Sequence, residues 1–138
     1  MAIVKFVAAK RTIKSALNYI INPEKTNETL ISGVNCTPES AESEFEFTKT
    51  KFNKHGGREY YHIVQSFSPD DNITPEIAHE IGLRFTEYFK GYQIVISTHC
   101  DKDHIHNHMI MNSVNYKTGK KFHQRMYLQK RYYYHRRS

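Results

Sequence analysis

The sequence lacks tryptophan, has only two cysteines among 138 residues, and contains no long apolar run. Cys36 and Cys100 form neither a CxxC pair nor the dense cysteine framework of small secreted domains, so a reducing, cytoplasmic setting is expected. No apolar stretch reaches the roughly 18 residues of a membrane helix, and the N-terminus lacks a signal-peptide pattern. We therefore expect a soluble intracellular protein without membrane insertion, formed by one domain large enough for a real core.

Positive charge is distributed unevenly along the chain. The segment from Lys117 to Ser138 has eight Lys or Arg residues and no acid, whereas residues 1–116 hold the other twelve bases against all fourteen acids. Aromatic rings accompany these cations, and such a mixture can stack on bases while it pairs with phosphates. We assign residues 1–124 to a folded domain and 125–138 to a basic, aromatic tail. The tail could equally be a solubilising end or the stub of a longer chain.

Hydrophobic periodicity and turn signals predict the element order β-α-α-β-α-β-β-β. Ile3 and Val4 should be core residues of the first strand, and residues 24–36 should be a polar connector. Gly56-Gly57 should end the second helix, and residues 121–123 should form a last edge strand. The apolar positions of the third helix, expected to face inward, are Ile77, Ile81, Phe85 and Tyr88 or Phe89. Helices packed on a central antiparallel sheet, an α+β sandwich, are the expected fold.

The most informative stretch is 94–115, in which four histidines lie between two apolar runs that look like paired strands. His106 and His108 are two residues apart, so on a strand they share one face and can converge on one divalent transition ion. We favour His99 as the third ligand because it ends a rigid strand, whereas His104 lies in the turn. The alternative is a polar hairpin whose histidines are only solvated.

Tyr19 is the second candidate. Thr12 is a suitable N-cap for a helix at 13–21 that Asn22-Pro23 ends, and its apolar stripe consists of Ile13, Ala16, Leu17, Ile20 and Ile21. At 3.6 residues per turn, Tyr19 lies roughly 120° from the centre of that stripe. Tyr19 is therefore either an ordinary surface residue or a residue with a special role.

Three segments carry a resemblance to a known family. Residues 99–112, HCDKDHIHNHMIMN, resemble the third motif of conjugative relaxases, the mobilisation nucleases of plasmids and integrative elements within the HUH endonuclease class. Residues 15–20, SALNYI, are similar to the first motif, and residues 62–67, HIVQSF, to the second. The motifs occur in the family's order and cover about residues 1–122. One departure is Asn107, which stands where the class name implies an apolar residue.

The resemblance implies an HUH-relaxase-like sandwich in which the tyrosine helix lies over a metal site on the sheet. It implies that Tyr19 is the nucleophile and that His99, His106 and His108 bind the metal, with Mn²⁺ or Mg²⁺ expected and Zn²⁺ or Ni²⁺ as alternatives. Candidates for supporting the ligands or transferring protons are Asp101, His62, His104 and Asn112. His62 could equally be an ordinary, partly buried histidine. Candidate DNA-binding residues are Arg11, Lys14, Lys120, Lys121, Arg125, Lys130 and Arg131.

The activity implied is metal-dependent nicking and rejoining of one DNA strand at an origin of transfer. The phosphate would be held as a 5′-phosphotyrosine ester, and the ion would neutralise developing negative charge. The implied partners are single-stranded origin DNA, accessory relaxosome proteins and a coupling protein. Two alternatives remain: a histidine-metal hydrolase acting on small substrates, and a non-catalytic nucleic-acid-binding fragment.

Overall fold

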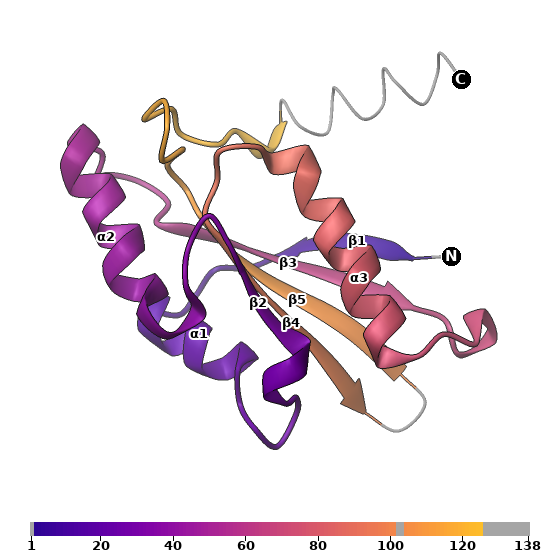
Figure 1. Ribbon diagram of the computed structural model, residues 1–138. Coiled ribbons are helices and arrows are strands. Elements are labelled where there is room, and N and C mark those ends of the chain that lie inside the picture. Colours follow the sequence, from indigo (N-terminus) through magenta and orange to yellow (C-terminus); the bar gives the residue numbers. More distant parts are fainter. Residues whose placement is uncertain (1, 102–103, 126–138) are drawn as a thin grey trace, which may run out of the picture.

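The computed structural model describes residues 2–101 and 104–125. Its five-stranded sheet has the order β1-β3-β5-β4-β2, and each neighbouring pair of strands is antiparallel (Figure 1). The elements, with 3-10 helices labelled η, are β1 (Ile3–Val7), α1 (Ile13–Ile20), η1 (Glu28–Leu30), β2 (Ile31–Val34), η2 (Pro38–Ser40), α2 (Ala41–Phe52), β3 (Tyr60–Phe67), η3 (Pro69–Asp71), α3 (Pro75–Phe85), η4 (Thr86–Phe89), β4 (Ile94–Asp101) and β5 (His104–Asn112). The expected α+β architecture is confirmed.

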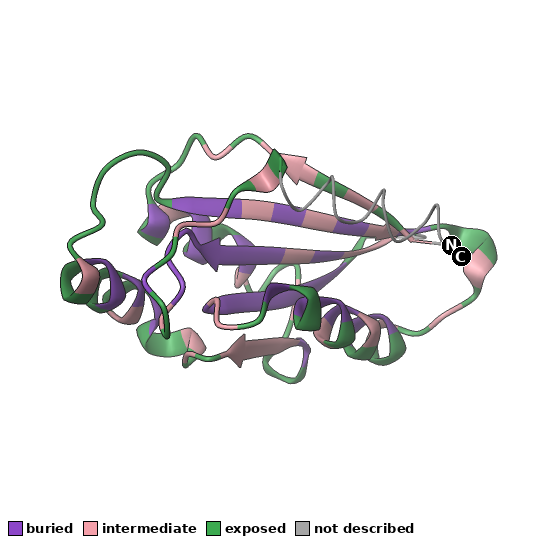
Figure 2. Ribbon diagram, turned by 90° about the horizontal axis from the view of Figure 1, so that it is seen from above, coloured by how far each residue is buried: buried purple, intermediate pink, exposed green. Residues whose placement is uncertain are grey.

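Successive strand residues point to opposite sides of the sheet, and apolar side chains occur on both sides. Helices therefore cover both faces. One buried cluster joins α1 and α2 to the sheet and includes Leu17, Phe45 and Ile110. A second cluster joins α3 to the other face and includes Phe85 and Met109. The alternation of buried and less buried residues along the strands is visible in Figure 2. Within the described residues, no helix is long and apolar enough to cross a membrane.

Helix α1 forms where its sequence pattern predicts. The hydroxyl of Thr12 accepts a hydrogen bond from the backbone N–H of Ser15, which satisfies one of the unpaired donors of the first turn. The stripe residues Ile13, Ala16, Leu17 and Ile20 are buried against the sheet, and Ile21 packs at its margin. Tyr19 is 41% exposed, as its position outside the stripe predicts.

The prediction of a polar connector at 24–36 was wrong, because this segment contains β2. Residues 31–34 pair with β4 at the edge of the sheet, in a strand of only four residues. Gly33 weakens the local strand signal, yet it is required here: a Cβ at this position would lie 2.1 Å from the carbonyl oxygen of Cys36. Pairing with the buried strand β4, rather than local propensity, therefore creates this strand.

The predicted inward face of α3 was right at Phe85 and, in η4, at Phe89, which are both buried, but wrong at Ile77 and Tyr88. Ile77 and Tyr88 are 50% and 67% exposed, while Ala78, His79 and Gly82 face the sheet together with Phe85. A Cβ at residue 82 would lie 2.4 Å from the Cδ1 atom of Ile96, so only glycine permits this close approach. The small residues thus set the rotation of the helix, and the larger Ile77 and Tyr88 remain outside.

Three smaller predictions also need correction. Ile3 is 61% exposed, because β1 is an edge strand and, among the described helices, none covers the side of β1 on which Ile3 lies. Helix α2 ends earlier than Gly56-Gly57, at Asn53, whose left-handed backbone (φ 54°) terminates it. The predicted last edge strand is reduced to a single antiparallel bridge between Val114 and Lys121.

Candidate active site

The β4–β5 hairpin brings three predicted ligands together. Its register pairs His99 with His106 and Ser97 with His108, so these side chains emerge on one face of the sheet. The ring centroids of His99 and His108 are 4.3 Å apart, and those of His106 and His108 are 6.4 Å apart. This is the face that α1 covers. The hairpin therefore gathers imidazoles from two strands in the centre of the sheet.

Each of these three histidines has one ring nitrogen in a hydrogen bond. The Nε2–H of His99 donates to the carbonyl oxygen of Ile20 at 2.7 Å. The Nδ1 atom of His106 lies 3.0 Å from Ser66 Oγ, and the Nδ1 atom of His108 lies 3.0 Å from His62 Nε2. Such outer contacts are typical of metal-binding histidines, since they fix the tautomer and the ring orientation. The second nitrogen of each ring is the one that could bind an ion.

The donor set fits a divalent transition ion, because several imidazoles on rigid strands suit such metals. In the described part of the chain, however, no group of three or more His, Cys, Asp or Glu side chains is arranged so that it could hold a metal ion. The observation that supports a fit is therefore the chemistry of the imidazoles, each of which has one ring nitrogen outside these hydrogen bonds.

Burial keeps this cluster neutral. Burial, with a smaller contribution from neighbouring cationic groups, lowers the pKa of His62 to about 4 and that of His108 to about 3. Burial also lowers the pKa of His99 and of His106. Removing a cation from water is unfavourable, and like charges at this spacing repel each other. All four rings therefore retain a lone pair at neutral pH, which is the state that metal coordination requires.

Tyr19 lies against this cluster, although it is distant in sequence. Its ring centroid is 5.9 Å from that of His108 and 6.3 Å from those of His62 and His99. The guanidinium carbon of Arg11 lies 4.7 Å from the centroid of the same ring. Helix α1 and the residue before its N-cap thus place a phenol and a cation beside the imidazoles, and the phenol remains accessible to a ligand.

The other candidate residues are divided between the two ends of the sheet. His104 pairs with Asp101 at the hairpin end, and its ring centroid lies 6.1 Å from that of His106. Asn112 lies at the other end of β5, where its side chain accepts a hydrogen bond from the ammonium group of Lys49 and donates to Gln93. The structure therefore does not bring Asn112 to the histidine cluster.

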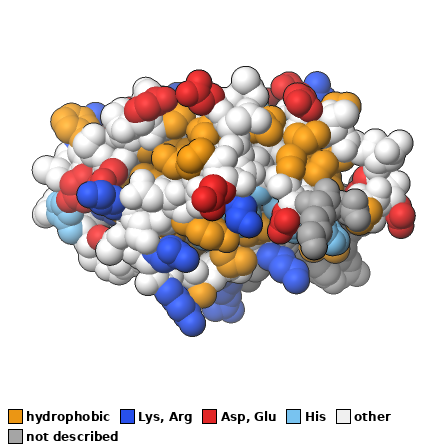
Figure 3. All heavy atoms as spheres, turned by 90° about the horizontal axis from the view of Figure 1, so that it is seen from below, with side chains coloured by type: hydrophobic (Ala, Val, Ile, Leu, Met, Phe, Trp, Pro, Cys, Tyr) orange, Lys and Arg blue, Asp and Glu red, His pale blue; other side chains and the backbone are white. Residues whose placement is uncertain are grey.

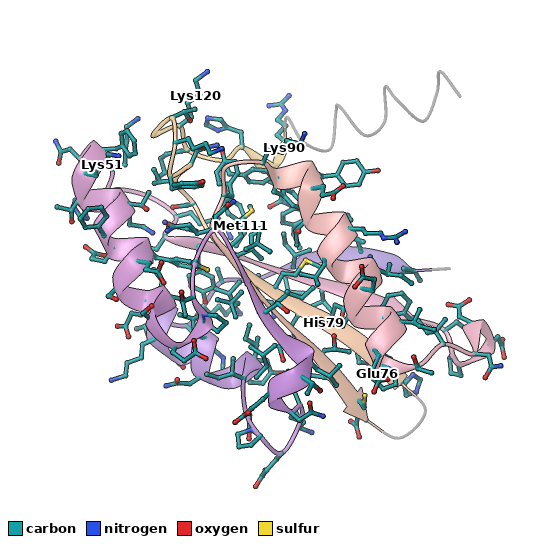
Figure 4. All side chains as sticks on the ribbon, in the orientation of Figure 1. Lys51, Glu76, His79, Lys90, Met111 and Lys120 are labelled. Carbon is teal, nitrogen blue, oxygen red and sulfur yellow. The ribbon has the colours of Figure 1, made fainter. Side chains whose placement is uncertain are left out.

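The predicted DNA-binding cations are also dispersed. Lys120 and Lys121 follow β5 beyond its far end, and the Lys121 ammonium donates to the carbonyl oxygen of Gly56. Figure 4 shows Lys120 at the opposite end of the molecule from Glu76. Glu76 lies near the hairpin end of the sheet, where burial and the Glu76 charge raise the pKa of the Cys100 thiol. Arg125 is exposed, whereas Lys130 and Arg131 lie outside the described residues.

Lys14 lines a groove of about 800 Å³ between α1 and α2, and none of the candidate-site histidines lines it. Acidic side chains line it, namely those of Glu39, Glu42, Glu46 and Glu59. Repulsion between these carboxylates and phosphates makes this groove unsuitable for a nucleic-acid backbone. Lys14 is therefore less well placed for DNA than Arg11.

Sequence reasoning missed one cation on the histidine face. Lys5 is exposed and pairs with Val64, which in turn pairs with His108, so the three side chains form one row across β1, β3 and β5. Strand alternation in β1 was the available signal, since Val4 and Phe6 pack on the opposite face. Figure 3, viewed from below, shows several Lys and Arg side chains along the lower margin of this face, whereas acids and bases stand side by side across its middle.

Comparison with known proteins identifies the family. The model of "Relaxase: MobA/VirD2-like, nuclease domain" matches residues 19–137, which is most of the chain. The chain belongs to this relaxase family. The matched region extends into residues 125–138, which we assigned to a separate tail. The boundary at residue 124 therefore stays a prediction. Relaxase nuclease domains of this kind generally use a divalent metal ion.

Curated relatives agree with the family. The relaxase domain is 42% identical over 132 residues to the group II intron-interrupted relaxase LtrB of Lactococcus lactis subsp. cremoris, covering 75% of this chain and 23% of the relative. It is 38% identical over 123 residues to a protein rlx of Staphylococcus aureus, covering 88% of this chain and 36% of the relative. The chain thus spans about a quarter to a third of these relatives' length. No solved structure matches it significantly.

Proposed function

We propose that this relaxase domain nicks and rejoins one strand of DNA at an origin of transfer through a covalent tyrosyl intermediate. The observation that carries the proposal is the contact of the Tyr19 ring with the rings of His62, His99 and His108. Transesterification needs a nucleophile beside a charge-stabilising centre, and Tyr19 beside these imidazoles meets both needs.

The reaction balances without a nucleotide cofactor. The Tyr19 oxygen attacks the scissile phosphorus and forms a phosphotyrosyl ester with the 5′ phosphate, while the P–O3′ bond breaks. The phenolic proton leaves Tyr19, and the departing 3′ oxygen gains a proton to become a free hydroxyl. The ester conserves the energy of the phosphodiester, so attack by a 3′ hydroxyl can reverse the step and restore the DNA strand.

His99, His106 and His108 are the residues that would hold the divalent ion, and the bound ion would supply Lewis-acid neutralisation of the phosphoryl oxygens. Mn²⁺ or Mg²⁺ is our first expectation, with Zn²⁺ or Ni²⁺ as alternatives. The hydrogen bonds of the rings leave Nδ1 of His99 and Nε2 of His106 and of His108 as the donor atoms.

This choice of donor atoms assigns a role to His62. If His108 coordinates through Nε2, its Nδ1 carries the proton and donates it to His62 Nε2 across 3.0 Å. His62 then orients His108 and cannot take the phenolic proton through that nitrogen. Ser66 orients His106 in the same way. We therefore interpret His62 as a residue that positions a ligand.

Arg11 and Lys5 support binding of a phosphate near Tyr19. The Arg11 guanidinium lies beside the Tyr19 ring, and Lys5 shares the sheet face of the histidines. Arg11 can pair with a phosphate oxygen by two parallel hydrogen bonds, whereas Lys5 offers a point charge. Single-stranded origin DNA is the proposed substrate, and accessory relaxosome proteins and a coupling protein are the proposed partners. The cytoplasmic location stays a prediction.

The decisive experiment is capture of the covalent intermediate. The protein is incubated with labelled single-stranded origin DNA and Mn²⁺, and denaturing electrophoresis is used to look for a protein-linked DNA band. Wild-type protein should give the band, and EDTA should abolish it. Tyr19→Phe should bind the DNA normally but give no band, and His106→Ala should give none at any practical Mn²⁺ concentration.

Two outcomes would contradict the proposal. A band of wild-type yield from Tyr19→Phe would assign the nucleophile to another residue. DNA binding with no band from the wild-type protein, tested on its own origin sequence, would instead favour a non-catalytic fragment. Tyr116→Phe is a suitable control, because Tyr116 follows β5 at the end of the sheet away from the histidines.

A further inference from the structure

The face of the sheet opposite the histidines carries a buried polar row that no step of the proposed reaction uses. Asn107 and Thr98 are completely buried, and Gln65 and His79 are nearly so. Gln65 pairs with Asn107 across β3 and β5, and Asn107 pairs with Thr98 across β5 and β4. This polar row, Gln65–Asn107–Thr98 with His79 from α3, lies directly behind the candidate ligands.

The hydrogen bonds of the row form one directed chain. The Oγ1–H of Thr98 donates to Asn107 Oδ1 at 2.6 Å, and the Asn107 amide donates to Gln65 Oε1 at 2.9 Å and to the carbonyl oxygen of Ala78 at 2.7 Å. Since the Thr98 hydroxyl proton is used, His79 Nδ1 must be the donor in its 2.8 Å contact with Thr98 Oγ1. The row therefore joins three strands to α3 with defined donors and acceptors.

His79 extends the chain to a fourth strand. Its Nε2 atom lies 2.7 Å from the Oγ atom of Ser32 in β2 and, with Nδ1 protonated, accepts the hydroxyl proton. Burial lowers the pKa of His79, which favours this neutral tautomer. His79 is the labelled side chain of α3 that points toward the sheet in Figure 4.

Each strand residue of the row is adjacent in sequence to a residue of the candidate site. Asn107 stands between His106 and His108, Thr98 precedes His99, and Gln65 precedes Ser66. Successive strand residues point to opposite faces of the sheet. Hydrogen bonds that fix the row residues on one face therefore also fix where the candidate-site residues emerge on the other face. A shift of the hairpin by two residues would keep the faces but separate His99 from His106. It would also break the chain of hydrogen bonds.

We infer that the polar row is a register lock: Asn107, Thr98 and His79 are positioning residues that keep the rings of His99, His106 and His108 together, as joint binding of a divalent ion would require. An apolar residue at 107 could fill the same space but could not select a register, because dispersion contacts are not directional. Gly82 belongs to the same device, since a Cβ there would lie 2.6 Å from the Asn107 amide nitrogen. This inference rests on the proposed function for its purpose, although the lock itself is a property of the metal-free protein.

A matched pair of threonines tests the lock. Thr98→Val removes the hydroxyl from the row and keeps the shape and β-branching of the side chain. Thr48→Val does the same in a second buried network, where Thr48 Oγ1 donates to Gln93 Oε1 at 2.8 Å near the opposite end of the sheet. Asn107→Leu is a second variant of the row. Urea unfolding gives the global stability of each variant. Hydrogen exchange can then be compared at urea concentrations that give all variants the same free energy of unfolding.

The first measurement is amide hydrogen exchange of the metal-free protein. Thr98→Val removes two hydrogen bonds of the row and Asn107→Leu removes three. Both should accelerate exchange in residues 97–101 and 104–108 by about tenfold or more, since one buried hydrogen bond is worth about 1 kcal/mol. Thr48→Val should leave these segments unchanged. Equal acceleration throughout the sheet, or acceleration of the same segments by Thr48→Val, would overturn the lock.

The second measurement is Mn²⁺ affinity by calorimetry. Thr98→Val and Asn107→Leu should weaken binding by about 10- to 100-fold, as observed when outer contacts of metal ligands are removed. Thr48→Val should bind like wild type, and wild-type affinity in both row variants would overturn the positioning role. If wild-type protein shows no His106-dependent Mn²⁺ binding and no DNA adduct, the proposed function fails, while hydrogen exchange still decides the lock.

Discussion

Acid should destabilise this domain through two particular histidines, because the fold holds them neutral. The pKa of His62 falls to about 4 and that of His108 to about 3, from an ordinary value of 6.5. The unfolded chain therefore binds more protons than the native state below pH 6.5. The stabilisation is fully present above that pH and is lost progressively as the pH falls toward these two native values.

The expected size follows from the slope of stability with pH. Each histidine that is protonated only in the unfolded state costs about 1.4 kcal/mol per pH unit. Between pH 6.5 and 5.0 this amounts to about 2 kcal/mol for one ring and at most about 4 kcal/mol for the pair. The upper value is a limit, since both rings are partly accessible to water.

Urea unfolding at several pH values, with chelator present, measures this effect. The free energy of unfolding should fall more steeply with acid in wild-type protein than in the His62→Gln, His108→Gln double variant. The difference between the two slopes isolates the pair from other groups. His55→Gln is the control, because His55 is exposed and lies beside Glu46 of α2, and it should reproduce the wild-type slope. Parallel curves for wild type and the double variant would refute the assignment of buried, neutral imidazoles.

Three further results are expected. Gly82→Ala should lower the free energy of unfolding by about 1–3 kcal/mol in urea titrations, because its Cβ would overlap Ile96 and force α3 away from the sheet. Arg11→Gln should reduce the slope of the logarithm of DNA affinity against that of salt concentration by about 0.7, the value for one lost phosphate contact on a single strand, whereas Lys120→Gln should change it little. Burial lowers the pKa of Lys49 from 10.5 to about 8, so between these pH values the unfolded chain still holds the proton that the native state has lost. The free energy of unfolding should therefore rise as the pH increases from about 8 to 10.5, and Lys49→Met should remove this rise in urea titrations.

The sequence alone determined the features that depend on neighbours in the chain. The cap at Thr12, the phase of α1 and the hairpin around His104 are encoded within a few residues, and strand alternation places His106 and His108 on one face. The motif order also indicated the relaxase family, which the comparisons confirm. The solvent-exposed position of Tyr19 followed from helical periodicity as well.

Only the tertiary structure decided the features that depend on distant partners. The strand β2 exists because β4 supplies its hydrogen bonds, and the inward face of α3 is set by the close approach at Gly82. Lys49 is buried because Glu59 and Asn112 offer it carbonyl oxygens from other strands and turns. Local patterns contain no information on which distant groups will meet, so packing and hydrogen bonding between elements determine these positions and bring Tyr19 to the histidines.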